Sequence, residues 1–530
     1  MDFVSNATTN NFLPSGKDLN LIDFRSPLSL WLPGLMAISF LAFLSYSPKV
    51  PKGVPEFTTE KYPFIGSYRF FTHKWSFWKS AVAKSKTGNF SFWLGKNHVV
   101  GVSGEAARKV YLEHHDMDHI KGVVLIGHGP DYINGTSTPQ HNIWKPTLGN
   151  GKSYAQRRLL ELQKTSQLAK RLPTLTKDCR ETFAAMAKSP FNGIVNPAHA
   201  CFALVCTQAT RVVGSDELVD DPATKAKLLH YLLILQITSS CHLLSFPWLS
   251  YFSVAYWKRQ YGRNGLKSLV TPIVNERMKY NAERKDDALQ HFIDNGDSPD
   301  YIITFLISMI FISQANGCVL AGAMLYSIAH HPEWQNKIYN EIKASASAQC
   351  KDKSAPLLEQ LDSLDVQGWE NMSQSIDQCY RECIRMWVAF PMGRVNEGSE
   401  DIVIPGTNQI IPAGGLASYN TIDVHYSEKL YPQPLKWDPA RFGEGREEMK
   451  QEAHGFMGWG AGRHPCNGIR WAKIQQNMIL AYALGMYEWS GCFKNGEPNP
   501  EFIPPTTALN ELAPALPQNL FCKAVPRVEK

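Results

Sequence analysis

The sequence predicts a mainly α-helical protein with a small β region, preceded by one N-terminal helix that crosses a membrane. Three observations lead to this prediction. Long stretches carry apolar residues at helical spacing, a few short stretches are β-branched and interrupted by glycine or proline, and an apolar stretch near the N-terminus has no charge. The chain has no internal repeat and no low-complexity tract, which excludes solenoids and propellers.

The uncharged stretch extends from Leu28 to Tyr46 and would form a helix about 28 Å long, close to the hydrocarbon thickness of a bilayer. It is long for a signal peptide, and Pro33 within it is tolerated in membrane spans. Lysines follow it closely, so residues 1–27 are expected on the luminal side. The alternatives are a buried core helix and a cleaved signal peptide.

Residues 47–57 contain three prolines and predict a stiff, extended linker between the span and the body. At about 150 residues per domain, the length of 530 residues alone would suggest roughly three units. Every other apolar stretch is better explained as part of a hydrophobic core than as a second membrane span. Residues 58–530 are therefore expected to form the body of the protein outside the membrane.

The charge and the cysteine content argue against two classes of protein. The 54 basic residues exceed the 48 acidic residues by only six, which is too dilute a charge for a nucleic-acid-binding protein. The 11 cysteines are odd in number and form no C-x-x-C pair, so a disulfide framework is not indicated. One cysteine is expected to differ in role from the others.

The order of elements follows from periodicity. Helical spacing extends over 155–187 and 225–240, whereas 90–102 and 401–411 look like strands and hairpins. Residues 301–331 predict one helix of roughly 46 Å, apolar on most faces, which must run through a core. Its isolated amides, Gln314 and Asn316, argue against a second membrane span and need a polar partner, which a cofactor or substrate cavity would provide.

Near the C-terminal end, Cys466 lies in the glycine-rich segment FMGWGAGRHPCNGIRWAK, directly before a predicted amphipathic helix. The helix dipole and the nearby Arg463, His464 and Arg470 are expected to stabilise a thiolate. Such a cysteine is a candidate nucleophile or metal ligand. An ordinary structural cysteine is the alternative.

These residues resemble the signature of the cytochrome P450 family, the haem-thiolate proteins. The family places an aromatic residue, a glycine and a basic residue before the cysteine and a glycine after it, and this chain has Trp459, Gly462, His464 and Gly468 at those positions. Tryptophan replaces the usual phenylalanine. The resemblance implies the P450 fold, haem b as cofactor, Cys466 as axial ligand of the haem iron, and a cofactor-binding loop that includes Gly460.

Two further segments support the resemblance. Glu382 and Arg385 form an E-x-x-R pair on one predicted helix face, and Arg441 lies in a P-A-R-F segment similar to that of the family. In the family these three residues form a buried network behind the haem. A solvated ion pair is the alternative for Glu382 and Arg385.

The resemblance also implies that the long helix over 301–331 carries the oxygen-activating site. Asn316 stands where the family usually has threonine, and it follows Ile312, Ser313, Gln314 and Ala315 instead of the usual alanine-glycine-x-acid. This string is similar to the cholesterol 7α-hydroxylase and prostacyclin synthase branch, with sterol demethylases next nearest. An asparagine donates and accepts hydrogen bonds, so it could hold water, and protons would pass through water or substrate hydroxyls. A purely structural asparagine is the alternative.

Haem propionates need cationic partners. The family's W-x-x-x-R pattern corresponds here to Tyr154 and Arg158, with Arg157 as a shifted candidate. Arg394 and His464 are the other candidates. For each of them a solvated surface cation is the alternative.

The resemblance implies a monooxygenase that inserts oxygen from O2 into a large lipophilic substrate, such as a sterol, triterpenoid or other terpenoid. It implies the endoplasmic reticulum membrane, a cytosolic catalytic domain and electrons from NADPH-cytochrome P450 reductase, for which Arg463, Arg470 and Lys473 form a candidate docking patch. A haem-thiolate isomerase or dehydratase and a non-catalytic haem-binding membrane protein remain alternatives. By family position the substrate cavity involves residues 120–139, 232–252, 312–316, 390–393 and 506–510.

Overall fold

The computed structural model describes most of the chain. The described residues are 27–45, 49–62, 66–95, 97–123, 143–144, 152–187, 193–237, 252–388, 391–506, 508–510 and 519–527. The chain divides into two compact units, Met1–Lys49 and Val50–Lys530. Residues 1–26, most of 120–139, residues 238–251 and Phe390, which include parts of the predicted luminal segment and substrate cavity, lie outside the described residues.

The first unit contains α1, Pro27–Ser45, at the position of the predicted span. The five largest apolar side chains described in it, Leu35, Met36, Ile38, Phe40 and Leu41, are all at least half exposed. A helix with apolar side chains on every face has no polar side to turn toward water. The membrane span at α1 stays a prediction.

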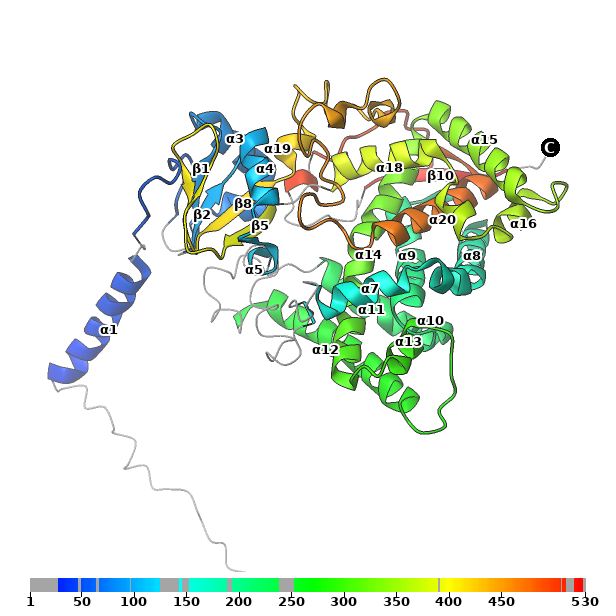
Figure 1. Ribbon diagram of the computed structural model, residues 1–530, viewed down its shortest axis with the longest axis horizontal. Coiled ribbons are helices and arrows are strands. Elements are labelled where there is room, and N and C mark those ends of the chain that lie inside the picture. The colour runs from blue at the N-terminus through cyan, green and yellow to red at the C-terminus, as the bar shows by residue number, and fades with distance from the viewer. Residues whose placement is uncertain are drawn as a thin grey trace, which may run out of the picture. The chain divides into compact units, whose positions relative to one another are not determined.

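The second unit begins with a small β region (Figure 1). Its five-stranded sheet has the order β1-β2-β8-β5-β3, in which β2 and β8 run parallel and the other neighbours antiparallel. The predicted strands over 90–102 are the hairpin of β1 and β2, and those over 401–411 are β6 and β7. The strands are β1 Phe90–Leu94, β2 Asn97–Gly101, β3 Met117–Asp118, β4 Ile194–Val195, β5 Pro391–Asn396, β6 Ile402–Val403, β7 Ile410–Ile411, β8 Leu416–Asn420, β9 Tyr487–Cys492 and β10 Phe521–Pro526.

The sheet takes in part of the predicted linker. The backbone N–H of Ile410 donates to the carbonyl of Gly53, and Ser91 donates to the carbonyls of Pro55 and Glu56. Phe57 forms a bridge with Ser91. Residues 53–57 are therefore an edge of the second unit, so its ordered structure begins before residue 58.

Two smaller sheets, β4-β10-β9 and β6-β7, and many helices complete the second unit. The helices are α2 Arg69–Thr72, α3 Lys74–Lys84, α4 Glu105–Glu113, α5 His119–Val123, α7 Tyr154–Leu162, α8 Thr165–Ala187, α9 Pro197–Val213, α10 Glu217–Asp220, α11 Pro222–Ile237, α12 Val254–Arg277, α13 Ala288–Asp294, α14 Pro299–Ala329, α15 Pro332–Gln349, α16 Leu357–Asp362, α17 Val366–Glu370, α18 Gln374–Trp387, α19 Ile422–His425 and α20 Ile469–Met486, with short 3-10 turns at Pro439–Phe442, Glu448–Lys450 and Ala508–Asn510. The helix predicted over 155–187 is interrupted between α7 and α8, at Gln163 and Lys164.

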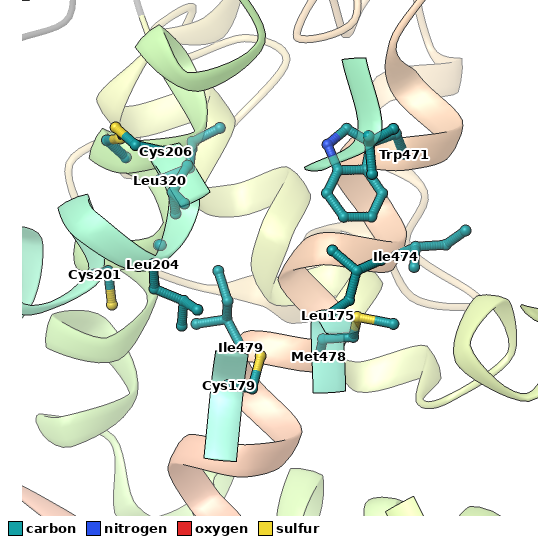
Figure 2. Packing of buried hydrophobic residues seen from close by; sticks show 14 of the residues in the cluster. Leu175, Cys179, Cys201, Leu204, Cys206, Leu320, Trp471, Ile474, Met478 and Ile479 are labelled. Carbon is teal, nitrogen blue, oxygen red and sulfur yellow. The ribbon is translucent and has the colours of Figure 1, made fainter. Parts of the chain in front are cut away.

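The largest core cluster surrounds α14, which is confirmed as a central helix. Figure 2 shows part of this cluster, where Leu204 of α9, Leu320 of α14, Leu175 of α8 and Ile479 of α20 are buried together. Among the described residues α14 is the helix long and apolar enough to cross a membrane. Every residue from Cys318 to Ala329 is nevertheless buried within the protein. This half of α14 belongs to the core.

Candidate active site

The turn that carries Cys466 is closed by its own backbone. The N–H of Cys466 donates to the carbonyl of Trp459 at 2.6 Å, which brings the two ends of the glycine-rich segment together. Two glycines make this turn possible. Gly460 and Gly462 have φ values of +67° and +64°, and a Cβ on them would lie 2.6 Å from the carbonyl oxygen of His464 and 2.4 Å from that of Leu112.

The Cys466 side chain is exposed, and α20 begins three residues after it. The surrounding protein raises the pKa of the thiol, while a hydrogen bond from the backbone N–H of Gly468 acts in the opposite direction. The net direction differs from the sequence-based expectation of a stabilised thiolate. The reason is that the protein atoms around the turn desolvate the sulfur, although the side chain remains accessible, and this effect outweighs that of the helix terminus. Arg470 is held by Glu370 at 2.5 Å.

The predicted Glu–Arg–Arg residues lie together behind this turn, and all three are almost fully buried. Arg385 of α18 donates to both carboxylate oxygens of Glu382 at 2.7 and 2.8 Å. The Nε of Arg441 lies 3.5 Å from the same carboxylate, and its Nη1 donates to Glu448 at 3.0 Å. Glu448 was not identified from the sequence. It supplies the second negative charge that two buried guanidinium groups require.

A buried histidine joins this network to the cysteine segment. Arg385 donates to the carbonyl of His425 at 2.6 Å, and the Nε2 of His425 accepts the backbone N–H of Met457 at 3.0 Å. Burial, followed by the positive charge of Arg385, lowers the pKa of His425 to about 3. The imidazole is therefore neutral at physiological pH, as its acceptor role requires.

The middle of α14 places Gln314 and Asn316 in different environments. Gln314 is fully buried against α9, where its Oε1 accepts from the thiols of Cys318 at 3.2 Å and Cys206 at 3.7 Å. Its Nε2 has no hydrogen-bond partner among the described residues. Asn316 is exposed, because residues two apart on a helix do not share a face. The structure therefore does not bring these two amides together.

Ala315 contributes its backbone to a contact between two helices. Its carbonyl accepts a hydrogen bond from the Nε2 of Gln236 in α11 at 3.1 Å. Nothing in the sequence indicated this contact, since it depends on how α11 crosses α14. Together with the exposed Ile312 and Asn316, this contact places polar groups and accessible surface side by side in the middle of α14.

The guanidinium group of Arg158 is paired with two carboxylates. It donates to the two oxygens of Asp297 at 2.7 and 2.5 Å and to Glu161 at 2.6 Å, while the hydroxyl of Tyr154 also donates to Asp297 at 3.0 Å. Asp297 precedes α14 by two residues and was not identified from the sequence. The neighbouring Arg157 has a buried Nε without a partner among the described residues. The assignment of Arg158 to a propionate stays a prediction.

Arg394, His464 and His119 form one group, in which Arg394 carries the positive charge and the two imidazoles offer ring N–H donors. The rings of His119 and His464 are stacked with centroids 4.5 Å apart, and the Nδ1 of His119 is buried without a partner among the described residues. Arg394 is buried, donates to the carbonyl of Leu112 at 3.1 Å and lies over the ring of Tyr111. Burial lowers the pKa of His464 to about 4, and the nearby His119 and Arg394 act in the same direction. Such a group suits an anionic partner.

A second polar cluster near the turn has a local explanation. The ligand atoms of His114, His115 and Asp116 lie within 4.8 Å of one another. The Nδ1 of His114 accepts the backbone N–H of Asp116 at 3.3 Å, and the carbonyl of Asp116 accepts the N–H of Glu397. These bonds close the turn after α4 and join it to the end of β5.

The comparisons with known proteins agree with this arrangement. The family model described as cytochrome P450 matches residues 55–512. A cytochrome P450 monooxygenase of Pseudocercospora fijiensis is 69% identical over 93% of this chain and 100% of its own length. The monooxygenase AacuE of Aspergillus aculeatus is 52% identical over 93% of this chain and 97% of its own. The solved structure of retinoic acid-bound cyanobacterial CYP120A1 has a TM-score of 0.68 at 16% identity, covering 90% of this chain and all of that one.

A helical protein with a cysteine turn of this kind, backed by a buried Glu–Arg–Arg network, has the architecture of a haem-thiolate enzyme. The chain belongs to the cytochrome P450 family, and the protein is a P450 monooxygenase of the fungal type. The family implies a haem-thiolate cofactor.

The residues present fit that cofactor. Cys466 offers an accessible sulfur to an iron atom, and the N–H of Gly468 already points to this sulfur as the family chemistry requires. The unpartnered Nδ1 of His119, together with Arg394 and His464, offers donors to carboxylates. Trp459 packs edge-on against Tyr380 beside the cysteine turn, with ring centroids 5.2 Å apart.

Proposed function

We propose that the protein uses Cys466 as the axial ligand of haem iron and inserts one oxygen atom from O2 into a large lipophilic substrate. The observation that carries this proposal is the cysteine turn, where an exposed sulfur accepts the N–H of Gly468 near the buried guanidinium group of Arg394 and the imidazoles of His119 and His464. Haem, when bound, supplies reductive activation of O2. The chain binds and orients the substrate and controls water and protons.

Asn316 is the side chain of α14 that we assign to proton and water control. It is exposed in the middle of a helix whose second half is buried, and it makes no side-chain hydrogen bond to a described residue. Its amide can donate one hydrogen bond and accept another, which allows it to hold a water molecule. Ala315 offers no carboxylate, so protons would reach the site through water or substrate hydroxyls.

The proposed substrate is a large lipophilic molecule of the sterol, triterpenoid or other terpenoid type. The support is the apolar surface at the middle of α14, where Ile312 is 49% exposed beside Asn316. Apolar surface of this kind binds apolar molecules by removing them from water. The amide of Asn316 offers one polar contact for a substrate hydroxyl.

Electrons are proposed to come from NADPH through a membrane-bound flavoprotein reductase. The candidate docking patch at the cysteine turn is partly neutralised in the structure, because Arg470 pairs with Glu370 and Lys473 pairs with Asp377 at 2.6 Å. Arg463 is exposed and has no carboxylate partner among the described residues. Arg463 is therefore the strongest candidate for attracting an acidic surface of the reductase.

The proposed location is the endoplasmic reticulum membrane, with α1 as a single span and the catalytic unit in the cytosol. The support is the uncharged apolar sequence of α1 together with Lys49 and Lys52, which follow it closely. An alkaline extraction of fungal microsomes would test this assignment. The full chain should stay with the membrane fraction, and release into the supernatant would contradict a spanning helix.

The second candidate is an isomerase or dehydratase that rearranges an oxygenated substrate without a reductase. It is favoured by one observation, namely that Asn316 and Ala315 replace the residues usual for oxygen activation. Reconstitution with NADPH, reductase and isotope-labelled O2 separates the two candidates. Label in the product supports the monooxygenase, whereas product formed without oxygen and reductase would overturn it.

A further inference from the structure

Gln163 lies at the elbow between α7 and α8 and is buried, although no motif includes it. Its Nε2 donates to the carbonyl of Asn467 at 2.6 Å and to the carbonyl of Leu159 at 3.1 Å. Its Oε1 accepts the backbone N–H of Trp471 at 3.1 Å. Because the amide nitrogen faces two carbonyls and the amide oxygen faces an N–H, the orientation of the amide is fixed by its partners.

The bond to Trp471 completes the start of α20. A helix leaves its first N–H groups without intrahelical partners, and a side chain at the N-cap usually accepts one of them. The N-cap of α20 is Gly468, which has no side chain. Gln163 provides the missing acceptor from another helix, so the N–H of Trp471 is satisfied although the chain has a glycine at the cap.

The bond to Asn467 acts on the sulfur through one peptide group. The carbonyl of Asn467 and the N–H of Gly468 belong to the same planar unit and point in opposite directions. Gln163 holds the carbonyl, and the N–H on the other side donates to the sulfur of Cys466. Fixing the carbonyl therefore aims the N–H, and a hydrogen bond to the carbonyl also polarises the peptide and strengthens its N–H as a donor.

We propose that Gln163 is a positioning residue that sets the strength of the Gly468 N–H bond to the Cys466 sulfur, and through it the reduction potential of the haem iron. This inference rests on the assignment of Cys466 as the haem ligand. Hydrogen bonds to a ligating sulfur withdraw electron density from it and raise the potential of the metal. Loss of the Gln163 bond should therefore leave the thiolate more electron-rich and lower the potential.

The chain contains a matched control for this effect. Gln335 of α15 is also a buried glutamine, and its amide donates to the carbonyl of Trp489 and accepts the N–H of Trp489, both at 2.8 Å. A methionine at either position keeps the approximate volume of the side chain and leaves backbone groups unpaired. Both variants therefore lose stability through the same physical cause. Gln163 alone contacts the cysteine turn.

The test compares wild-type holoenzyme with Gln163→Met and Gln335→Met by spectroelectrochemistry of the ferric–ferrous couple and by resonance Raman spectroscopy of the ferric iron–sulfur stretch. We expect Gln163→Met to have a more negative potential, a higher stretching frequency and a several-fold faster loss of the thiolate-type reduced-CO band. Gln335→Met should keep the wild-type potential and frequency. An unchanged potential in Gln163→Met, or an equal shift in Gln335→Met, would overturn the proposal.

A second variant covers the case in which Gln163→Met does not fold. Gln163→Glu keeps an oxygen acceptor for the N–H of Trp471 and lacks the donor to Asn467. Lys164→Gln changes the net charge by the same amount at an exposed neighbouring position. The potential of Gln163→Glu should fall further than that of Lys164→Gln, and equal shifts would show that charge alone acts.

The assignment of Cys466 as haem ligand and the assignment of Gln163 as positioning residue would be overturned by different results. A wild-type protein without a thiolate-type reduced-CO band would overturn the role of Cys466, and this inference with it. A wild-type protein with that band, together with an unchanged potential in Gln163→Met, would overturn the role of Gln163 alone.

Discussion

The cysteine side and the α14 side of the candidate active site are built differently. On the cysteine side, the backbone groups of the turn are held on several sides. Gln163 and His425 bind them from other parts of the chain, and the carbonyl of Trp459 binds the N–H of Cys466 within the turn. In the middle of α14, Asn316 is exposed and the Nε2 of Gln314 has no described partner. The first region is fixed before any ligand arrives, and the second leaves polar atoms for ligands and water to satisfy.

This difference separates the general chemistry of the family from the particular chemistry of this enzyme. A sulfur ligand must keep one geometry, so its surroundings carry a dense hydrogen-bond network. A surface that contacts substrate must suit one molecule, so its polar groups vary in number and position. Changes on the cysteine side should consequently damage the cofactor site as a whole, while changes on α14 should alter how the reaction proceeds.

The largest effect is expected from Cys466→Ser, because serine cannot supply the thiolate. Turnover and the thiolate-type reduced-CO band should both disappear in the purified protein. Cys350→Ser, at a partly exposed cysteine far along the chain, should leave the spectrum unchanged. A Cys466→Ser protein that kept the thiolate-type band would contradict the ligand assignment.

Glu382→Ala should destabilise the fold by about 3–5 kcal/mol, because it leaves Arg385 and Arg441 buried without their shared carboxylate. Urea unfolding and haem retention would measure the loss. The control is Glu276→Ala at the end of α12, where Glu276 forms an exposed pair with Lys279 and a change of less than about 1 kcal/mol is expected. Similar losses in both variants would contradict the structural importance of the network.

The cysteine side should also weaken as the pH falls. The pKa of His425 is lowered to about 3 in the fold, below the value of about 6.5 in an unfolded chain, so the unfolded chain binds the proton first. His425 therefore stabilises the fold above pH of about 6.5, and this contribution is lost toward pH 3 by up to about 1.4 kcal/mol per pH unit. Urea unfolding at pH 7 and pH 5 would measure this.

His425→Gln should show a smaller difference between those two pH values, because its neutral amide does not titrate. The exposed His199→Gln is the control and should keep the wild-type difference. Equal pH sensitivity in wild type and His425→Gln would show that other groups cause the acid loss.

Asn316→Ala should have the mildest effect on the protein and a specific effect on turnover. We expect the haem to be retained, with a several-fold rise in NADPH consumed per product formed, because the alanine cannot hold water. Ser313→Ala is the control on the same helix, since the Ser313 hydroxyl already donates to the carbonyl of Met309 at 2.6 Å. Unchanged coupling in Asn316→Ala would assign the asparagine a structural role.

The sequence predicted the parts of the molecule that depend on local pattern. The central helix, the two hairpins and the grouping of Glu382, Arg385 and Arg441 follow from periodicity and from motifs with fixed spacing. The partners Glu448, Asp297, His119 and Gln163 were missed because each lies in no motif and meets its partner only through tertiary packing. The break between α7 and α8 was missed as well, because residues 155–187 keep their apolar periodicity across Gln163.

The direction of the Cys466 pKa also could not be read from the sequence. A helix terminus and nearby cations favour a thiolate, but burial around the sulfur opposes it more strongly. Sequence shows which charges are near in the chain, whereas desolvation and the pairing of Arg470 with Glu370 depend on the folded surface.

The edge formed by residues 53–57 has a practical consequence for protein production. An enzyme shortened at residue 58 would lose the carbonyls of Gly53, Pro55 and Glu56, and with them hydrogen bonds to Ile410 and Ser91. A chain that starts at Val50, where the second compact unit begins, retains all of them. Truncation for crystallisation or solution assays should therefore remove α1 and stop short of Gly53.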